Sequence, residues 1–160
     1  MTGFGRILAD LNAAKVRFVV VGGIAVVRHG FVRATRDVDA VVARDEENVA
    51  AMRGLLARWQ ATRPDGSPLP PDSIVAGRSL HLSTPHGDVD LLADRPSPLS
   101  FEELLARAEV RKVDGVPVPI VSLADLVALK RRAGRERDLL DLRSLEEAHG
   151  TLPDPPGPSP

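Results

Sequence analysis

The 160-residue sequence contains no cysteine, no tyrosine and few aromatic side chains. Without cysteine, the chain can form neither a disulfide framework nor a metal site built on thiolates. A base-stacking surface for RNA or single-stranded DNA needs several exposed aromatic rings. We do not expect such a surface, because the aromatic residues are limited to Phe4, Phe18, Phe31, Trp59 and Phe101.

The sequence also lacks an excess of charge and a long apolar run. Its formal net charge is −1 at pH 7, which argues against a general polyanion binder but leaves room for a local basic patch. The longest apolar run, residues 18–27, holds two glycines and is too short to span a bilayer. No basic stretch precedes an apolar one at the N-terminus. We therefore expect a cytoplasmic protein that does not enter the membrane.

Proline is concentrated in two segments, residues 63–72 and 150–160. Proline lacks a backbone N–H and cannot continue a helix or a central strand. We expect the first segment to be a surface loop and the second to be a disordered tail. The remainder, residues 1–149, has a suitable length for one domain with a single hydrophobic core.

Apolar residues between these segments follow helical and strand periodicities in turn. Helices are expected at residues 3–14, 24–29, 45–59 and 101–108, then one that Ser122 caps and Gly134 interrupts, and a last one at 135–148. Strands are expected at residues 17–21, 37–42, 79–83, 88–92, 110–113 and 116–121, of which the last four form two hairpins. This mixture predicts an α/β (α+β) fold in which helices flank a mixed β-sheet.

Two adjacent glycines, Gly22 and Gly23, stand between a predicted buried strand and a predicted helix. Backbone N–H groups at the start of a helix attract anions, and glycine lets a phosphate approach the chain closely. The same pair also fits a tight strand-to-helix turn that binds nothing. This motif alone leaves both interpretations open.

Two pairs of acidic residues lie on predicted strands: Asp37 with Asp39, and Asp88 with Asp90. Residues two apart on a strand share a face, so the carboxylates of each pair converge and repel one another. Either solvent or a hard cation such as Mg²⁺ or Mn²⁺ must offset that repulsion. If the two strands are neighbours, three or four carboxylates meet, as in two-metal sites for phosphoryl transfer.

The order of these motifs matches a known pattern. Gly-Gly is followed by thirteen residues, an Asp-x-Asp between apolar residues, and then an apolar-Asp-apolar strand; residues 123–142 add a C-terminal motif. Over about residues 5–148, the chain resembles the DNA polymerase beta-type nucleotidyltransferase superfamily. It is most similar to small bacterial members, namely the AbiEii-like toxins and the minimal nucleotidyltransferases. The resemblance implies the nucleotidyltransferase fold.

The resemblance also implies a role for each glycine and aspartate of the pattern. The Gly-Gly pair would hold the β- and γ-phosphates of an NTP, and Asp37 and Asp39 would bind Mg²⁺ or Mn²⁺. Asp90 would bind a metal ion as well and activate the acceptor hydroxyl. Asp88 is the rival for this third position, because it shares the face of Asp90. Many members have Gly-Ser where this chain has Gly-Gly, which removes one hydrogen bond to phosphate.

Basic residues near these motifs could contact a nucleotide. Lys130, one of only three lysines, falls on the apolar side of its helix and needs an anionic partner unless its amine snorkels to solvent. A triphosphate, as the resemblance implies, and Asp138 are the two candidates. Arg33 and Arg36 could each bind a phosphate or pair with a carboxylate. Residues 130–137 carry a charge of +4, which fits either a solvated helix face or a phosphate contact.

The four histidines lack the spacing of a zinc site, and we expect ordinary polar roles for His81 and His86 near their hairpin. The implied function is metal-dependent transfer of an NMP from an NTP to an acceptor hydroxyl, with release of pyrophosphate. The acceptor could be an RNA end such as that of tRNA, a protein or a small molecule. The alternatives are a non-catalytic nucleotide- or partner-binding subunit, such as a toxin–antitoxin component, and a phosphoesterase. Base preference and oligomeric state stay open.

Overall fold

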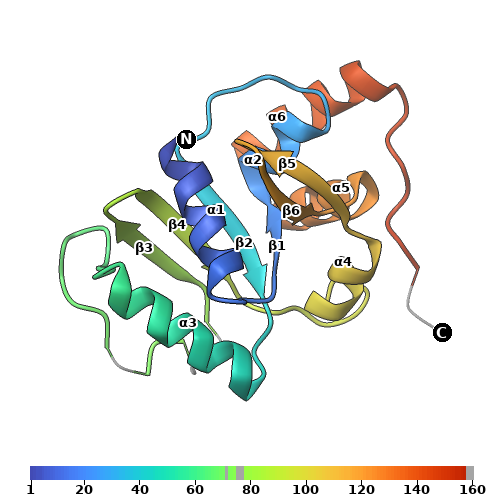
Figure 1. Ribbon diagram of the computed structural model, residues 1–160. Helices are drawn as coiled ribbons and strands as arrows, with labels where there is room; N and C mark the ends of the chain where they lie inside the picture. Colours follow the sequence, from blue (N-terminus) through green and yellow to red (C-terminus); the bar gives the residue numbers. More distant parts are fainter. Residues whose placement is uncertain (71, 75–77, 158–160) are drawn as a thin grey trace.

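The computed structural model describes residues 1–70, 72–74 and 78–157, and a six-stranded β-sheet forms its centre (Figure 1). The strands are β1 (Phe18–Val21), β2 (Asp37–Val42), β3 (Leu80–Thr84), β4 (Gly87–Leu92), β5 (Glu109–Val113) and β6 (Val116–Ile120). Their order in the sheet is β3-β4-β2-β1-β6-β5. The pairs β1–β6 and β2–β4 are parallel, and the other three are antiparallel. The predicted mixed sheet is thereby confirmed.

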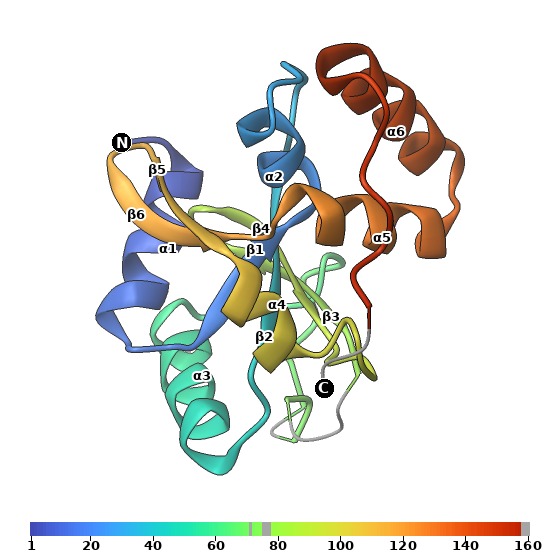
Figure 2. The same cartoon turned by 90° about the vertical axis from the view of Figure 1, so that its right-hand side faces the viewer.

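Six helices pack around the sheet in the described part of the chain. They are α1 (Gly3–Ala13), α2 (Gly22–Arg28), α3 (Glu46–Arg58), α4 (Phe101–Arg107), α5 (Leu123–Ala133) and α6 (Glu136–His149). Helices α1 and α3 lie on one side of the sheet, whereas α2, α5 and α6 lie on the other (Figures 1 and 2). The predicted α/β (α+β) class, with helices flanking the sheet, is confirmed.

The junction of β1 and α2 differs from the prediction. The short helix was expected from residue 24, but α2 begins at Gly22. Val21 is the N-cap residue and is still extended, so the last residue of β1 leads directly into the first turn of the helix. Both glycines therefore belong to the first turn of α2 rather than to a loop between two elements.

Side chains alternate along β2, so that apolar residues face the core and the two aspartates face the other side of the sheet. Val38, Ala40 and Val42 have no exposed surface and belong to the hydrophobic core. Asp37 and Asp39 lie on the opposite face of the same strand and are only partly buried. Because β2 is a central strand, its acids stand in the middle of the sheet rather than at an edge.

A sharp turn sets α6 against α5. Gly134 ends α5 in the left-handed conformation, with φ at 62°, and α6 starts two residues later. The N-cap Ser122 of α5 accepts a hydrogen bond from the backbone of Asp125, as the sequence predicts. The turn brings the C-terminal part of α5 and the first residues of α6 together above the sheet (Figure 2).

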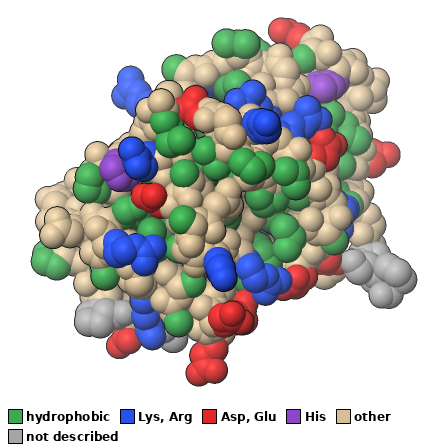
Figure 3. Space-filling model, in the orientation of Figure 1, with side chains coloured by type: hydrophobic (Ala, Val, Ile, Leu, Met, Phe, Trp, Pro, Cys, Tyr) green, Lys and Arg blue, Asp and Glu red, His purple; other side chains and the backbone are tan. Residues whose placement is uncertain are grey.

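The proline-rich segments are only partly described. Residue 71 of the first segment and residues 158–160 of the second lie outside the described residues. Residues 150–157 contain no helix or strand, and Leu152 packs against the core. In the described part of the chain, every helix is too short or too polar to cross a bilayer. Basic, acidic and hydrophobic side chains are interspersed on the face shown in Figure 3.

Candidate active site

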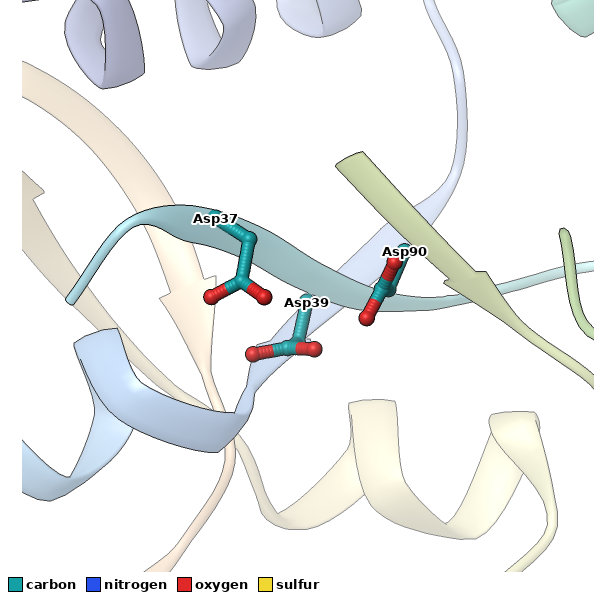
Figure 4. A group of neighbouring side chains, drawn as sticks. All are labelled: Asp37, Asp39 and Asp90. Carbon is teal, nitrogen blue, oxygen red and sulfur yellow. The ribbon is translucent and has the colours of Figure 1, made fainter. Parts of the chain in front are cut away.

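Three carboxylates converge on adjacent strands. β2 and β4 are parallel neighbours, and their register pairs Asp39 with Asp90 and Asp37 with Asp88. One oxygen each from Asp37, Asp39 and Asp90 lies within 4.8 Å of the other two. Figure 4 shows Asp39 between the other two carboxyl groups. We call these three residues the acid group.

Asp88 does not belong to the acid group. It is exposed at the beginning of β4, and its carboxylate accepts a hydrogen bond from Ser83 Oγ at 2.7 Å. The sequence offered Asp88 and Asp90 as rivals for the third position. The structure brings Asp90 to Asp37 and Asp39, and it leaves Asp88 outside.

The acid group carries more negative charge than its surroundings compensate. Burial, together with the charges of Asp37 and Asp90, raises the pKa of Asp39 to about 6, although a hydrogen bond from the backbone of Gly23 opposes the rise. Hard carboxylate oxygens at this separation are typical ligands of Mg²⁺ and Mn²⁺. A divalent cation would remove the repulsion that the raised pKa reports.

Close contacts explain both glycines of the motif. Gly22 has a φ of 63°, and a Cβ atom there would overlap the carboxylate of Asp39. A Cβ atom at Gly23 would lie 2.5 Å from Thr35 Oγ1 and 3.1 Å from Arg33 Nη2. The glycines thus let Asp39, Thr35 and Arg33 approach the first turn of α2, a need that the sequence analysis did not anticipate.

A histidine contacts the acid group from the edge of the sheet. His81 on β3 pairs with Asp90 on β4, and its Nδ1 lies 2.7 Å from Asp90 Oδ1. The sequence analysis expected only an ordinary polar role for this residue. Counting the hairpin register outward from the turn between Thr84 and Gly87 would have placed His81 opposite Asp90.

A second charged cluster connects α5, α6 and the loop before β2. Lys130 Nζ lies 3.2 Å from Asp138 Oδ1 and 2.7 Å from Asp141 Oδ2. Arg33 Nε lies 3.2 Å from Asp141 Oδ1. We call these four residues the ion-pair cluster. Of the two partners expected for Lys130, the structure supplies Asp138.

Asp141 and Arg135 complete the surroundings of this cluster. Asp141 is three residues beyond Asp138 on α6, so both carboxylates share one helix face, a signal that the sequence analysis overlooked. Burial raises the pKa of Asp138, but hydrogen bonds from Arg135 and Lys130 outweigh that effect and hold it below its usual value. The pKa of Arg135 is raised mainly by Asp138 and further by Asp39 and Asp90.

One pocket is lined by members of both groups. It includes Gly22, Gly23, Asp39, Asp90, His81, Arg33, Lys130, Asp138, Arg135 and Arg137, with aliphatic side chains of α5. Arg95, in the loop after β4, also lines the pocket, although no sequence pattern pointed to it. Arg36 is exposed and is not among the lining residues.

His81 also belongs to a wider groove on the outer side of β3. Arg63, Arg78 and Leu80 are among the other residues that line it. Because His81 is common to both cavities, the groove adjoins the pocket of the acid group.

Solved structures of low sequence identity share this fold. A candidate nucleotidyltransferase from Thermotoga maritima is 17% identical, with a TM-score of 0.59 over 90% of each chain. The antibiotic-resistance factor ANT(2″)-Ia in complex with adenylyl-2″-tobramycin is 13% identical, with a TM-score of 0.60 over 92% of this chain and 87% of that one. An antigenic nucleotidyltransferase-like protein from Paracoccidioides brasiliensis is 17% identical, with a TM-score of 0.59 over 90% of this chain and 72% of that one.

Comparison of sequences is more specific than these shared folds. No curated protein matches the chain. The family described as "Nucleotidyl transferase AbiEii toxin, Type IV TA system", however, matches residues 6–155, nearly the whole sequence. The resemblance of the glycine, Asp-x-Asp and C-terminal motifs is thus confirmed, and the chain belongs to the AbiEii family of nucleotidyl transferase toxins.

Proposed function

We propose that this protein is a Mg²⁺- or Mn²⁺-dependent nucleotidyltransferase that moves an NMP from an NTP to an acceptor hydroxyl. The observation that carries the proposal is the convergence of Asp37, Asp39 and Asp90, of which Asp39 and Asp90 line a pocket that basic residues also line. Membership of a nucleotidyl transferase family supports the same reaction.

The acid group fits a divalent cation. One hard oxygen from each of the three acids lies within 4.8 Å of the other two, and burial with repulsion from Asp37 and Asp90 raises the pKa of Asp39 to about 6. We assign the cation to these three residues. When bound, it supplies positive charge that offsets the charge of the phosphates during transfer.

Basic residues of the pocket would bind the triphosphate. We assign the β- and γ-phosphates to the backbone of Gly22 and Gly23, with Arg33 and Lys130 nearby. The exposed Arg95 and Arg137 line the same pocket and add positive charge, as does Arg135. Arg36 is not among the residues that line the pocket, so we assign it no contact with a triphosphate bound there.

The transfer itself requires little covalent chemistry from the protein. The acceptor oxygen attacks the α-phosphorus, the bond to the bridging oxygen of the β-phosphate breaks, and pyrophosphate leaves. Asp90 accepts the proton of the attacking hydroxyl. Catalysis would come mostly from orientation and from charge placed around the phosphates.

The acceptor we favour is the end of an RNA such as tRNA. The groove beside His81 contains Arg63 and Arg78, which suit a phosphate backbone. The basic run 130–137 offers further contacts. A small-molecule hydroxyl is the second candidate, because ANT(2″)-Ia, with the same fold, was solved with adenylyl-2″-tobramycin.

A non-catalytic role is the alternative from a different class. As a toxin–antitoxin component, the chain could act by binding a partner protein or a nucleotide without transfer. The acid group argues against this role, because its three carboxylates are all in place. A loss of the reaction would remove the reason to keep three repelling acids together.

Transfer of label tests the proposal. The purified protein is incubated with each of the four labelled NTPs, Mg²⁺ or Mn²⁺, and either tRNA, an aminoglycoside or a cell extract. We expect a labelled acceptor that requires the metal and that disappears with Asp39→Ala. Equal labelling by Asp39→Ala would contradict the mechanism, and nucleotide binding without any labelled acceptor would favour the non-catalytic role.

A further inference from the structure

Two side chains of β3 each contact an acid of β4. The register places His81 opposite Asp90 and Ser83 opposite Asp88. His81 Nδ1 lies 2.7 Å from Asp90 Oδ1, and Ser83 Oγ donates to Asp88 Oδ1 over the same distance, 2.7 Å. The edge strand therefore makes the same kind of contact twice, two residues apart.

Only one of these contacts reaches the acid group. Asp90 lies within 4.8 Å of Asp37 and Asp39 and lines the pocket, whereas Asp88 does neither. The His81 contact therefore acts on a carboxylate of the site, and the Ser83 contact acts on a carboxylate outside it. Ser83 provides an internal control that the chain itself contains.

Packing does not explain His81. Its side chain is 65% exposed, whereas the Asp90 side chain is 21% exposed. Leu82, the residue between the two polar positions, points the other way into the core and is 1% exposed. Removing the imidazole should therefore cost little stability, and its direct effect should fall on Asp90.

The contact fixes the orientation of the Asp90 carboxylate. An ionised carboxylate can only accept, so His81 Nδ1 carries the hydrogen of this bond. The terminal torsion of an aspartate is broad, and without a partner the carboxylate can turn. Because His81 engages Oδ1 from the β3 side, the carboxylate is held in one orientation beside Asp37 and Asp39.

We propose that His81 is a positioning residue that holds Asp90 in the orientation needed to bind the divalent cation and to receive the acceptor. Its effect on transfer rests on the proposed function. Its effect on cation binding rests only on the geometry of the acid group. His81 also lines the adjoining groove with Arg63 and Arg78, so it would stand at the side from which the acceptor enters.

Three variants of the full chain test this role: His81→Ala, His81→Asn and Ser83→Ala. Asparagine carries its amide nitrogen on Cγ, as histidine carries Nδ1, so His81→Asn keeps a donor at about the same place. Mn²⁺ binding to each protein is measured from the electron paramagnetic resonance of free Mn²⁺. Steady-state transfer of label then gives kcat and the KM for NTP, and thermal unfolding checks that each variant folds.

We expect His81→Ala to weaken Mn²⁺ binding by about tenfold or more, a typical loss for a residue that orients a metal ligand. It should lower kcat more than it raises the KM for NTP, while His81→Asn recovers most of both losses. Ser83→Ala should match the wild type in Mn²⁺ binding and in kcat.

Equal Mn²⁺ binding by His81→Ala and Ser83→Ala would overturn the inference, and so would a failure of His81→Asn to recover binding. If His81→Ala selectively weakens Mn²⁺ binding but the wild type transfers no label, the inference stands and the proposed function fails. If the wild type transfers label and His81→Ala is unchanged in kcat and in Mn²⁺ binding, the function stands and the inference fails.

Discussion

The acid group and the ion-pair cluster both contribute side chains to one pocket, yet their charge balance differs. The acid group contains three carboxylates, and burial with mutual repulsion raises the pKa of Asp39 to about 6. The ion-pair cluster sets Arg33 and Lys130 against two buried carboxylates of α6. There the pKa of Asp138 is lowered, despite its burial.

The opposite directions of the two pKa shifts reflect whether basic side chains of the protein contact the carboxylate. A raised carboxylate pKa means that the folded protein disfavours the ionised form, and a bound cation would offset that cost. A lowered one means that the protein itself supplies the cation. We therefore assign the proposed divalent cation to the acid group. The ion-pair cluster links α5, α6 and the loop that carries Arg33, on the side of the pocket that we assign to the triphosphate.

The largest expected effect is loss of transfer in the acid group. Asp37→Asn or Asp39→Asn should reduce the rate on the order of 10³-fold, because several kcal/mol of charge stabilisation in the transition state depends on a held cation. Labelled-NTP transfer at saturating Mg²⁺ measures the loss. Asp88→Asn is the matched control, since it removes an equal charge from the neighbouring strand β4 outside the group, and it should keep most of the activity. Equal losses in all three variants would contradict the boundary drawn around the acid group.

The next effect is on stability in the ion-pair cluster. Lys130→Met would remove the ammonium group that pairs with the buried carboxylates of Asp138 and Asp141. Breaking such a buried ion pair lowers the free energy of unfolding by about 3–5 kcal/mol. We expect the free energy of unfolding in urea to fall by about 3 kcal/mol, since Arg33 and Arg135 still neutralise part of the charge.

Arg132→Met is the control for Lys130→Met. Arg132 lies on the same helix but is exposed, so its loss should leave the urea midpoint unchanged. Lys130 has a second candidate role as a triphosphate ligand. Wild-type stability of Lys130→Met, combined with lost NTP affinity, would show that Lys130 serves the nucleotide instead of the cluster.

Much of this comparison could be predicted from the sequence, because periodicity controls which residues share a face. The acids at positions i and i+2 of β2 were expected on one side of the strand, and Lys130 was expected to face inward with Asp138 as one candidate partner. These inferences need only the local geometry of a strand or a helix.

The features of the site that the sequence did not predict depend on contacts between distant segments of the chain. Local geometry places Asp88 and Asp90 on the same face, and only the register of β2 against β4 and the contact with Ser83 separate them. Arg33 pairs with Asp141, more than a hundred residues away, and no periodicity connects the two. Arg95 lies in an irregular loop, where side-chain direction follows no repeating pattern.

The pH dependence of stability offers a smaller test of the same contrast. Because the pKa of Asp39 is raised from 3.8 to about 6, the folded state binds more protons than the unfolded state between these values. Burial of the Asp39 carboxylate, with repulsion from Asp37 and Asp90, therefore lowers the free energy of unfolding as pH rises through this window, by about 3 kcal/mol in total. Asp39→Asn should be more stable than the wild type at pH 7 without metal, and the difference should vanish near pH 4.

Urea titrations of both proteins at a series of pH values measure the contribution of Asp39 together with its repulsion of Asp37 and Asp90, because the rest of the chain is shared. Adding Mg²⁺ or Mn²⁺ should stabilise the wild type and narrow the difference, since the cation binds the folded acid group. A variant that is no more stable than the wild type at pH 7 would mean that the repulsion is already compensated, and the contrast with the ion-pair cluster would be lost.

The smallest expected effect comes from the glycine that lets Asp39 take its position. Gly22→Ala places a Cβ atom against the Asp39 carboxylate at a φ of 63°, a conformation that costs an L-residue about 1–2 kcal/mol. Gly54→Ala is the control, because Gly54 lies within α3 with no atom near its missing Cβ, and alanine should stabilise the helix by about 0.5–1 kcal/mol. If Gly22→Ala also weakens Mn²⁺ binding while Gly54→Ala does not, the strain at α2 is transmitted to the acid group. A Gly22→Ala protein that loses stability but keeps its Mn²⁺ affinity would instead mean that Asp39 can withdraw from α2 without leaving the other two acids.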